Sequence, residues 1–329
     1  MNIQHIAKLI ENAGGRLYLV GGAVRDEFLK DAGAGIKTCP NDEDYCITGL
    51  AGEEFEKLFP EAHSRGKSFE VYDLEGREFA LARKDVKEGT GHKGFKIITG
   101  KDITIEEDLK RRDITINSMA KDVITGEIID PFGGREDIKA KLIRATDTSF
   151  LEDPLRAYRA ARFAADFEYD VHEDTIKLIN ILKPELNTLS KERVFVEFRK
   201  ALGSKRPSIF FDVLKKAEIL DVHFKEIYDL IGAQQPLQYH PEGDSYNHTI
   251  IALNNSTILT DNLEIRFAAL VHDLGKGETP EELYPHHYGH AESGVEPVRN
   301  LCRRIGVPNR WRKAGVVSSA EHMKRWHFL

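Results

Sequence analysis

The sequence is poor in cysteine and contains no long apolar run. Its 329 residues include three cysteines, Cys39, Cys46 and Cys302, and none of them forms a C-x-x-C pair. An odd, widely spaced set argues against a disulfide framework, so we expect a cytoplasmic protein. No apolar stretch approaches the about 18 residues that cross a membrane. The N-terminus lacks a basic start and a long apolar centre, so no secretory signal and no membrane contact are predicted.

The sequence also has fewer positively than negatively charged residues. There are 47 Lys and Arg residues against 54 Asp and Glu residues, which gives a net charge of −7. This balance disfavours a protein that coats nucleic acid without discrimination, although local basic patches remain, such as Lys110-Arg111-Arg112. A hydrophobic share of 41% and a charged share of 31% are typical of a globular chain. The length predicts two or more domains.

The order of the patterns predicts an α+β fold. Residues 1–145 alternate strand-like runs with short helical ones, which indicates a head with a small mixed sheet and helices. Residues 146–231 have helical periodicity and are expected to form a helical neck and body. Residues 232–245 are rich in Gly, Pro and Gln and are interpreted as a linker. Residues 246–329 are again helical, with many histidines, and predict a metal-binding domain.

The first candidate site follows a short apolar run, Leu17-Tyr18-Leu19-Val20. The run stops at Gly21-Gly22 before a helical stretch, and a loop then leads to Asp42 and Asp44. Residues two apart on a strand face the same side, and a divalent cation between them would relieve their repulsion. A glycine turn beside such a pair indicates a metal–nucleotide site. The alternative is a simple bend followed by a solvated Asp-x-Asp turn.

Two further motifs extend this hypothesis. Glu78 opens an apolar run, and it completes a two-ion site only if its strand pairs with the strand of the aspartates. The alternative is a solvent-facing strand residue. Adjacent charges at Arg112-Asp113 indicate triphosphate or ribose contacts held by an ion pair, or else a charged turn.

The stretch from Glu152 to Arg162 predicts a helix start, with Asp153 as N-cap and Pro154 at the first position. The structural interpretation is a cap with an ion pair between Asp153 and Arg156. The functional one is base reading, because a carboxylate accepts from an amino group and a guanidinium donates to a ring nitrogen. Cytosine and adenine offer that pattern, whereas guanine and uracil offer the reverse. Arg159 and Arg162 would then reach phosphates.

A histidine-rich segment carries the last motif. His248 precedes His272-Asp273, which follows an apolar run, and three more histidines end at His290. Imidazoles and a carboxylate together suit Mn, Ni, Fe or Zn, so a hydrolytic metal centre is predicted. The alternative is a set of histidines hydrogen-bonded in the core.

Taken in order, these motifs resemble a known family. LVGGAVRD, a D-x-D, EFALARK, EEDLKRRDITINSMA, IIDPFGG, EDPLRAYRAARFA and HDLGKGETPEEL follow one another along the chain. The set closely resembles the bacterial class II tRNA nucleotidyltransferases, specifically CCA-adding enzymes with an HD phosphohydrolase domain. These belong to the DNA polymerase beta-like nucleotidyltransferase superfamily, and bacterial poly(A) polymerases share the head and neck.

The resemblance implies a role for each motif, with a catalytic head in residues 1–145 and recognition of the base and of RNA in residues 146–231. It implies Mg²⁺ at Asp42 and Asp44, a third carboxylate at Glu78, and a transition metal such as Ni or Mn at the HD motif. The segment Gly89 to Gly94 matches a flexible loop thought to help switch from C to A addition. The implied nucleotide contacts are Gly22, Arg25, Arg112, Asp113, Asp153, Arg156, Arg159 and Arg162, and the implied HD ligands are His248, His272 and Asp273. The last ligand of the HD pattern is not identifiable, because His322 is followed by Met323 where an acid is expected.

The implied activity is template-independent addition of C, C and A to tRNA from CTP and ATP, by a monomer or homodimer. Phosphatase and 2′,3′-cyclic phosphodiesterase activities are implied for the HD domain. The alternatives are partial CC or A addition, A tailing, an HD phosphohydrolase with a degenerate head, or a non-catalytic tRNA-binding module. Related enzymes continue through a further helical region beyond the point that matches Leu329, so a shortened C-terminus is expected.

Overall fold

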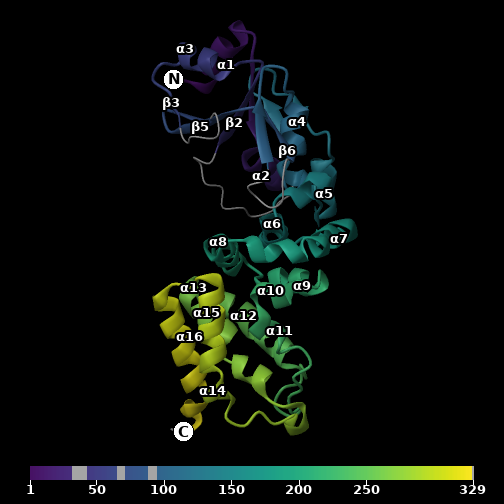
Figure 1. Ribbon diagram of the computed structural model, residues 1–329, viewed down its shortest axis with the longest axis vertical. Coiled ribbons are helices and arrows are strands. Elements are labelled where there is room, and N and C mark those ends of the chain that lie inside the picture. The colour runs from purple at the N-terminus through teal and green to yellow at the C-terminus, as the bar shows by residue number, and fades with distance from the viewer. Residues whose placement is uncertain (32–42, 65–70, 88–94, 328–329) are drawn as a thin grey trace. The chain divides into compact units, whose positions relative to one another are not determined.

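The structure is a computed structural model that describes residues 1–31, 43–64, 71–87 and 95–327 (Figure 1). The chain forms two compact units, Met1–Asp153 and Pro154–Leu329. The first combines a mixed sheet with helices, and the second is helical apart from the two-residue strand β11 (Asp170–Val171). The predicted α+β fold is confirmed. The finer division into head, neck, linker and HD domain stays a prediction.

The first unit is built on a seven-stranded sheet with the strand order β3-β4-β5-β2-β1-β8-β9. Strands β2 and β5 run parallel, and all other neighbours in this sheet run antiparallel. The strands are β1 (Arg16–Val20), β2 (Asp44–Thr48), β3 (His63–Ser64), β4 (Val71–Leu74), β5 (Arg77–Leu81), β8 (Ala120–Asp122) and β9 (Ile128–Ile129). A separate ribbon pairs β6 (Arg83–Lys87) with β7 (Phe95–Thr99), and β10 (Leu142–Ile143) follows.

Helices complete this unit. They are α1 (Ile3–Asn12), α2 (Gly22–Asp31), α3 (Gly52–Leu58), α4 (Ile105–Lys110) and α5 (Gly134–Ala140), with 3₁₀ turns η1 (Thr115–Asn117) and η2 (Thr148–Glu152). Side chains that alternate along a strand point to opposite faces of a sheet. One set, including Leu17 and Tyr45, joins a core with residues of α1 and α3. The other set, including Tyr18 and Cys46, joins a core with residues of α4. Buried on both faces, the central strands hold their polar ends in defined positions.

The second unit is a helical assembly. Its helices are α6 (Leu155–Phe167), α7 (Glu173–Ile181), α8 (Lys191–Leu202), α9 (Ser208–Lys216), α10 (Leu220–His223), α11 (Lys225–Tyr228), α12 (Ser245–Leu259), α13 (Leu263–Val271), α14 (His290–Ser293), α15 (Val295–Ile305) and α16 (Asn309–Glu321). Four 3₁₀ turns lie between or after them: η3 (Lys183–Thr188), η4 (Leu274–Glu278), η5 (Glu281–Leu283) and η6 (His322–His327). Within the described chain, every helix is too short or too polar to cross a membrane.

Aromatic side chains form the centre of this second unit. Phe198 of α8 lies 5.4 Å from Phe224, measured between ring centroids, and Phe224 packs edge-on against Phe210 and Phe211 of α9. Phe267 of α13 reaches the same cluster through Phe198. Large aromatic rings remove much apolar surface from water, so they contribute strongly to packing. The helices that follow Pro154 and those of the histidine-rich segment therefore share one core.

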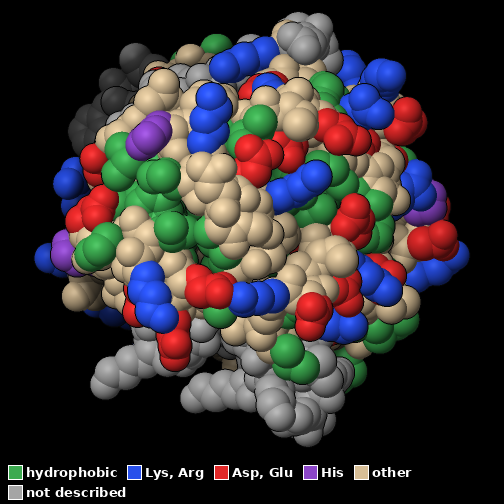
Figure 2. Space-filling model, turned by 90° about the horizontal axis from the view of Figure 1, so that it is seen from above, with side chains coloured by type: hydrophobic (Ala, Val, Ile, Leu, Met, Phe, Trp, Pro, Cys, Tyr) green, Lys and Arg blue, Asp and Glu red, His purple; other side chains and the backbone are tan. Residues whose placement is uncertain are grey.

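The start of α6 lies within one residue of its prediction. The helix is assigned from Leu155, with Pro154 before it. Asp153 is extended and Pro154 already has helical dihedral angles, which are the conformations of an N-cap and a first helical residue. Figure 2 shows a surface on which Lys and Arg side chains alternate with Asp and Glu side chains.

Candidate functional site

Two carboxylates lie side by side on the sheet of the first unit. The parallel pairing of β2 with β5 places Asp44 directly opposite Glu78, and β4 places Asp73 opposite Glu78 from the other side. Residues opposite each other on paired strands project from the same face. Asp44 and Glu78 are both exposed. The strand pairing that the Glu78 hypothesis requires is therefore present, whereas Asp42 lies outside the described residues, as does the loop from Gly89 to Gly94.

The glycine turn is next to these carboxylates. Asp44 is the register partner of Val20, the last residue of β1, and Gly21 follows immediately. Gly21 has a φ of +69°, a conformation that side chains with a Cβ rarely adopt. A Cβ added there would lie 2.8 Å from Nη1 of Arg112. The missing side chain thus lets the Arg112 guanidinium approach the start of α2.

A buried carboxylate of α4 positions the two arginines that follow this helix. Asp108 is 1% exposed, and its Oδ1 accepts from Nη2 of Arg111 at 2.6 Å, while its Oδ2 accepts from Nη2 of Arg112 at 3.3 Å. Burial raises the pKa of Asp108, but the charges of Arg111 and Arg112 lower it more, so the net shift is downward. Sequence reasoning missed Asp108. The (i, i+3) and (i, i+4) spacing to the two arginines was the available signal.

Asn117 connects the other two predicted nucleotide contacts of this unit. Nη1 of Arg25 donates to Oδ1 of Asn117 at 2.6 Å, and Nδ2 of Asn117 donates to Oδ1 of Asp113 at 3.2 Å. Nε of Arg25 also donates to Oδ1 of Asp26 at 2.8 Å. Gly22, Arg25, Arg112 and Asp113 therefore meet around one turn, and Asn117 is a member that the motif search did not single out.

The arginines of α6 differ in their surroundings. Arg156 and Arg159 are partly exposed near the start of the helix, and Arg159 lies 5.5 Å from the ring of Phe163. Arg162 is 7% exposed, and its Nε donates to Oε2 of Glu197 at 2.6 Å. Its Nη1 donates to Oδ2 of Asp166 at 2.5 Å. Removing one partner of such a buried pair leaves an uncompensated charge, so Arg162 has a structural task in joining α6 to α8.

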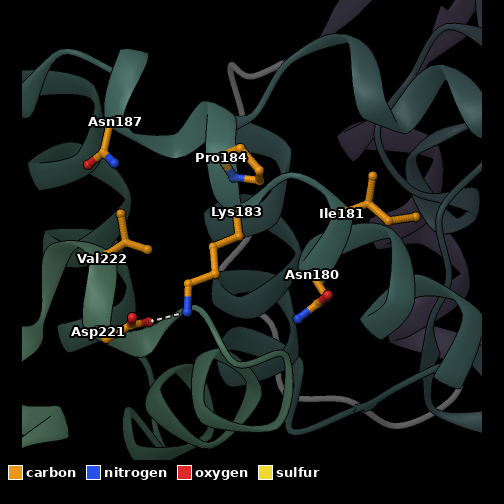
Figure 3. A pocket seen from close by; sticks show the side chains of 7 residues that line it. All are labelled: Asn180, Ile181, Lys183, Pro184, Asn187, Asp221 and Val222. Carbon is orange, nitrogen blue, oxygen red and sulfur yellow. Dashed lines mark ion pairs between the residues drawn. The ribbon is translucent and has the colours of Figure 1, made fainter.

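A shallow pocket lies elsewhere in the second unit. Its most polar contact is the ion pair between Nζ of Lys183 and Oδ1 of Asp221 at 2.8 Å, drawn as a dashed line in Figure 3. The pocket is lined by Asn180, Ile181, Lys183, Pro184, Asn187, Asp221 and Val222 (Figure 3). The exposed side chain of Ile181 lines this pocket together with asparagine amides and the ion-paired Lys183. Such a lining suits contact with another surface better than catalysis.

The histidine-rich segment folds around Asp273, which is 2% exposed. Nε2 of His272 lies 3.2 Å and Nε2 of His248 lies 3.6 Å from Oδ2 of Asp273. Two histidines that were not predicted as ligands lie on the other side of the carboxylate. Nε2 of His322 is 3.1 Å and Nε2 of His290 is 3.3 Å from Oδ1.

These groups satisfy the spacing of a metal site. Among the described residues, His248 with His272 and Asp273 forms one candidate set, and Asp273 with His290 and His322 forms another. Met323 stands where an acid is expected, and the preceding residue, His322 at the C-cap of α16, is the one that reaches Asp273. Its signal in the sequence was weak, because His322 lies far along the chain from His272. By contrast, the neighbouring His287 contacts Thr279 and Gln234 and belongs to neither set.

A loop supports this centre. Residues 232–244 are closed by a bridge between Gln234 and Asp244, and they carry Glu242, which accepts from Nδ1 of His248 at 2.5 Å. From the same loop, Oε1 of Gln235 accepts at 2.5 Å from Nζ of Lys276, and this Nζ also lies 2.7 Å from Oδ2 of Asp273. The stretch interpreted as a linker thus contributes contacts around the histidines.

The electrostatics favour an ionised Asp273. Burial raises its pKa, but the imidazoles of His272, His290 and His322 lower it more, so the pKa lies well below its usual range. Burial lowers the pKa of His248, which favours the neutral ring that can bind a metal. Burial lowers the pKa of His322, but its contacts with Asp273 raise it more, so the net shift is upward. A carboxylate among imidazoles is a donor set for a transition-metal ion.

Comparison with known proteins identifies the family. Residues 17–144 match a family model described as Poly A polymerase head domain, residues 168–230 one described as Probable RNA and SrmB- binding site of polymerase A, and residues 245–328 one described as HD domain. The head domain and the HD domain imply dependence on divalent metal. The pocket of Figure 3 lies within the second match.

Relatives cover most of the chain. The Multifunctional CCA protein of Shewanella frigidimarina (strain NCIMB 400) is 43% identical over 314 residues, which is 93% of this chain and 73% of that protein. A CCA-adding enzyme in complex with ATP has a TM-score of 0.64 at 23% identity, covering 97% of this chain and 68% of the other. A Thermotoga maritima CCA-adding enzyme complexed with tRNA has a TM-score of 0.62 at 20% identity, covering 98% and 80%. The structural likeness shows the fold, and the sequence identity shows that this chain belongs to the family of multifunctional CCA proteins.

Proposed function

We propose that the protein adds C, C and A to the 3′ end of tRNA from CTP and ATP, without a nucleic-acid template. One observation carries this proposal. Asp44 and Glu78 lie side by side on paired strands, and the Gly21 turn with Arg112 lies at the end of the neighbouring strand. Carboxylates beside a phosphate-binding turn are what nucleotidyl transfer requires. The 43% identity to a multifunctional CCA protein supports the same substrate.

The exposed carboxylates of Asp44 and Glu78 fit Mg²⁺, which prefers oxygen ligands and keeps several waters. Together with Asp42 they would hold it. When bound, the ions activate the attacking hydroxyl and neutralise charge on the leaving group. In the reaction, the tRNA 3′-hydroxyl oxygen bonds to the α-phosphorus, the bond to the bridging oxygen breaks, and pyrophosphate leaves. The carboxylates orient the nucleotide for this in-line displacement.

The turn and its arginines would hold the triphosphate. The N-terminus of α2 offers backbone N–H groups and a partial positive charge to an anion. Arg25 is oriented by Asn117 and Asp26, and Arg112 by Asp108, so neither guanidinium has to be ordered when the nucleotide arrives. Asp113 is 6% exposed and accepts from Asn117, so it would act on the nucleotide through Asn117.

Base selection is assigned to Asp153 and Arg156. A carboxylate and a guanidinium at this spacing match the amino donor and ring-nitrogen acceptor of cytosine and adenine, and mismatch guanine and uracil. Arg159, one helical turn further along α6, would reach a phosphate. Arg162 would do so only if it broke its ion pair with Glu197. The segment 168–230, which contains the pocket, is proposed to contact tRNA. The cysteine pattern predicts that the protein works in the reducing cytoplasm.

The proposal is tested with purified protein and tRNA that ends before CCA. We expect two additions from CTP alone, a third when ATP is also present, and none from UTP or GTP, read on sequencing gels. Addition that stops after CC would indicate a partial enzyme. Repeated A addition would indicate a poly(A) polymerase. Absence of any incorporation would refute the transferase.

Replacing Asp153 with alanine should lower the preference for CTP and ATP over UTP and GTP. One lost pair of hydrogen bonds to a base edge reduces discrimination by about 10- to 100-fold. The measurement is kcat/KM for each nucleotide in the same assay. Glu152→Gln, an adjacent neutralisation, is the matched control and should keep the preference. Unchanged selectivity in the Asp153 variant would remove it from base reading.

A second activity is proposed at the histidine cluster. We infer that His248, His272 and Asp273 bind a divalent transition metal such as Ni²⁺ or Mn²⁺ and hydrolyse phosphomonoesters and 2′,3′-cyclic phosphates. A bound metal lowers the pKa of its water and so supplies a nucleophile. Glu242 orients His248, because a carboxylate on the second ring nitrogen fixes the tautomer that leaves Nε2 for the metal. The alternative that the chain is mainly such a hydrolase requires hydrolysis without nucleotide incorporation.

A further inference from the structure

Two segments that are tied to each other border the histidine cluster. They are residues 232–244 and residues 279–289, and together they are called the rim here. Nε2 of His287 in the second segment lies 2.8 Å from the carbonyl oxygen of Gln234 in the first. The first segment reaches the cluster through Glu242, which contacts His248, and the second leads directly into His290, which contacts Asp273. The rim therefore frames the entrance to one site.

The rim carries exposed aromatic and apolar side chains. Among the residues that the structure describes, five large hydrophobic side chains are more than 70% exposed, and three of them, Leu237, Tyr239 and Tyr288, belong to the rim. Single exposed hydrophobic residues are ordinary on a protein surface. Several of them on neighbouring segments beside a polar site indicate a binding surface. Tyrosine suits such a surface, because it offers a flat apolar ring with a polar tip.

Both tyrosines lie next to residues that contact the cluster. Tyr288 precedes His290 by two residues, a span of at most about 7 Å. Gly289 between them has a φ of +74°, so the chain turns sharply from the exposed tyrosine to the histidine. Tyr239 precedes His240, whose ring centroid lies 4.9 Å from that of His248. In a nucleotide, only the ribose separates the base from the phosphate. One such ligand could therefore contact a tyrosine of the rim and the cluster at once.

The ring of Tyr288 is held in place before any ligand arrives. Its centroid lies 5.5 Å from that of His286, and the two ring planes are inclined by 22°. A side chain that is already ordered loses little freedom when a ligand stacks on it. Aromatic side chains stack on every nucleobase, since each base has a π-face. Because the adjoining cluster suits a phosphate ester, these contacts favour a nucleotide over an apolar peptide.

We propose that Tyr239 and Tyr288 form a stacking surface for the base of the phosphate ester that is hydrolysed at the histidine cluster. The ligand class is then a base joined through ribose to a phosphate, either in a free nucleotide or at the 3′ end of an RNA chain. This inference rests on the proposed phosphohydrolase function and narrows its substrates. A phosphate ester without a base gains nothing from the two rings.

The first test compares hydrolysis of 2′-AMP with that of glycerol 2-phosphate by the full chain in the presence of Mn²⁺. Tyr288→Ala and Tyr239→Ala should each lower kcat/KM for 2′-AMP by about 5- to 100-fold, the range that one lost stacking contact gives. The loss should fall mainly on KM, and glycerol 2-phosphate should be unaffected. Tyr288→Phe keeps the ring and should keep the activity. Tyr228→Ala, which removes an exposed tyrosine outside the rim, is the matched control.

A second measurement does not depend on hydrolysis. The fluorescence of 2-aminopurine riboside 2′-phosphate is quenched when its base stacks on an aromatic ring, and the titration is done in a chelator. We expect strong quenching by the unmodified chain and by Tyr228→Ala, and weak quenching by Tyr288→Ala and Tyr239→Ala. Binding of the probe to the first unit is the same in all four proteins, so the difference between them reports the rim.

The outcomes separate the stacking surface from the hydrolase. Equal losses for 2′-AMP and glycerol 2-phosphate, or quenching that neither tyrosine affects, would overturn the stacking surface. Quenching that depends on the tyrosines in a chain that hydrolyses neither ester would support the surface and refute the hydrolase. A larger loss for an RNA trinucleotide with a 2′,3′-cyclic phosphate end than for 2′,3′-cyclic AMP would identify an RNA end as the ligand. Equal losses for these two would identify the free nucleotide.

Discussion

Replacing Asp44 with asparagine should lower the rates of both C and A addition by about 100- to 10,000-fold. Metal ions stabilise the charge of a phosphoryl transition state by several kcal/mol. Each about 1.4 kcal/mol lost from that stabilisation is a tenfold loss of rate. Asparagine keeps the shape and one oxygen of the side chain but removes the charge that binds the ion. Single-turnover rates with CTP and with ATP measure the loss, and it should be alike for both, because one centre serves every addition.

The matched control is Glu43→Gln. Glu43 is the preceding residue, and its carboxylate accepts from the hydroxyl of Tyr45 at 2.7 Å, an acceptor role that glutamine can keep. We expect rates within a few-fold of the unmodified protein for this variant. tRNA binding by the Asp44 variant should also stay close to normal, since the substitution leaves the rest of the chain in place. C or A addition at an undiminished rate in the Asp44 variant would contradict the assignment of the catalytic centre.

Replacing Asp273 with asparagine should abolish most hydrolysis of phosphomonoesters, with a loss of about 100-fold or more. The loss follows because a catalytic metal supplies several kcal/mol, and the variant lacks the buried carboxylate that the four histidines approach. Metal content and the hydrolysis rate are measured on the same samples. A second variant, His272→Gln, weakens the same centre and should give the same direction if the Asp273 variant folds poorly.

Asp261→Asn is the control for this second prediction. Asp261 has a fully exposed side chain in the turn before α13, and the neutral variant should retain both metal and hydrolysis. The Asp273 variant should continue to add nucleotides, since the transferase carboxylates belong to the other compact unit. Retention of hydrolysis at full rate after loss of Asp273 would place that activity elsewhere.

Local patterns were sufficient for many elements of the fold. The apolar run 17–20 became β1, the run from Glu78 became β5, and the helical periodicity after Phe150 became α6 to α9. These predictions succeed because side-chain alternation and helical spacing depend on neighbours in the chain. The assigned start of α6 at Leu155 differs from the predicted one by a single residue, while the extended Asp153 and the helical Pro154 have the dihedral angles that the capping pattern predicts.

Sequence also determined which chemical groups this protein has available: an Asp-x-Asp pair, a glycine turn, arginines beside acids and a His-Asp pair. Only the tertiary structure decided which of them meet. Parallel pairing of β2 with β5 brought Glu78 beside Asp44, burial tied Arg162 to Glu197, and the packing of α16 brought His322 to Asp273. Such encounters join residues far apart in the chain. They are set by strand register and by the burial of apolar faces, and neither leaves a local signal around the polar residues that it brings together.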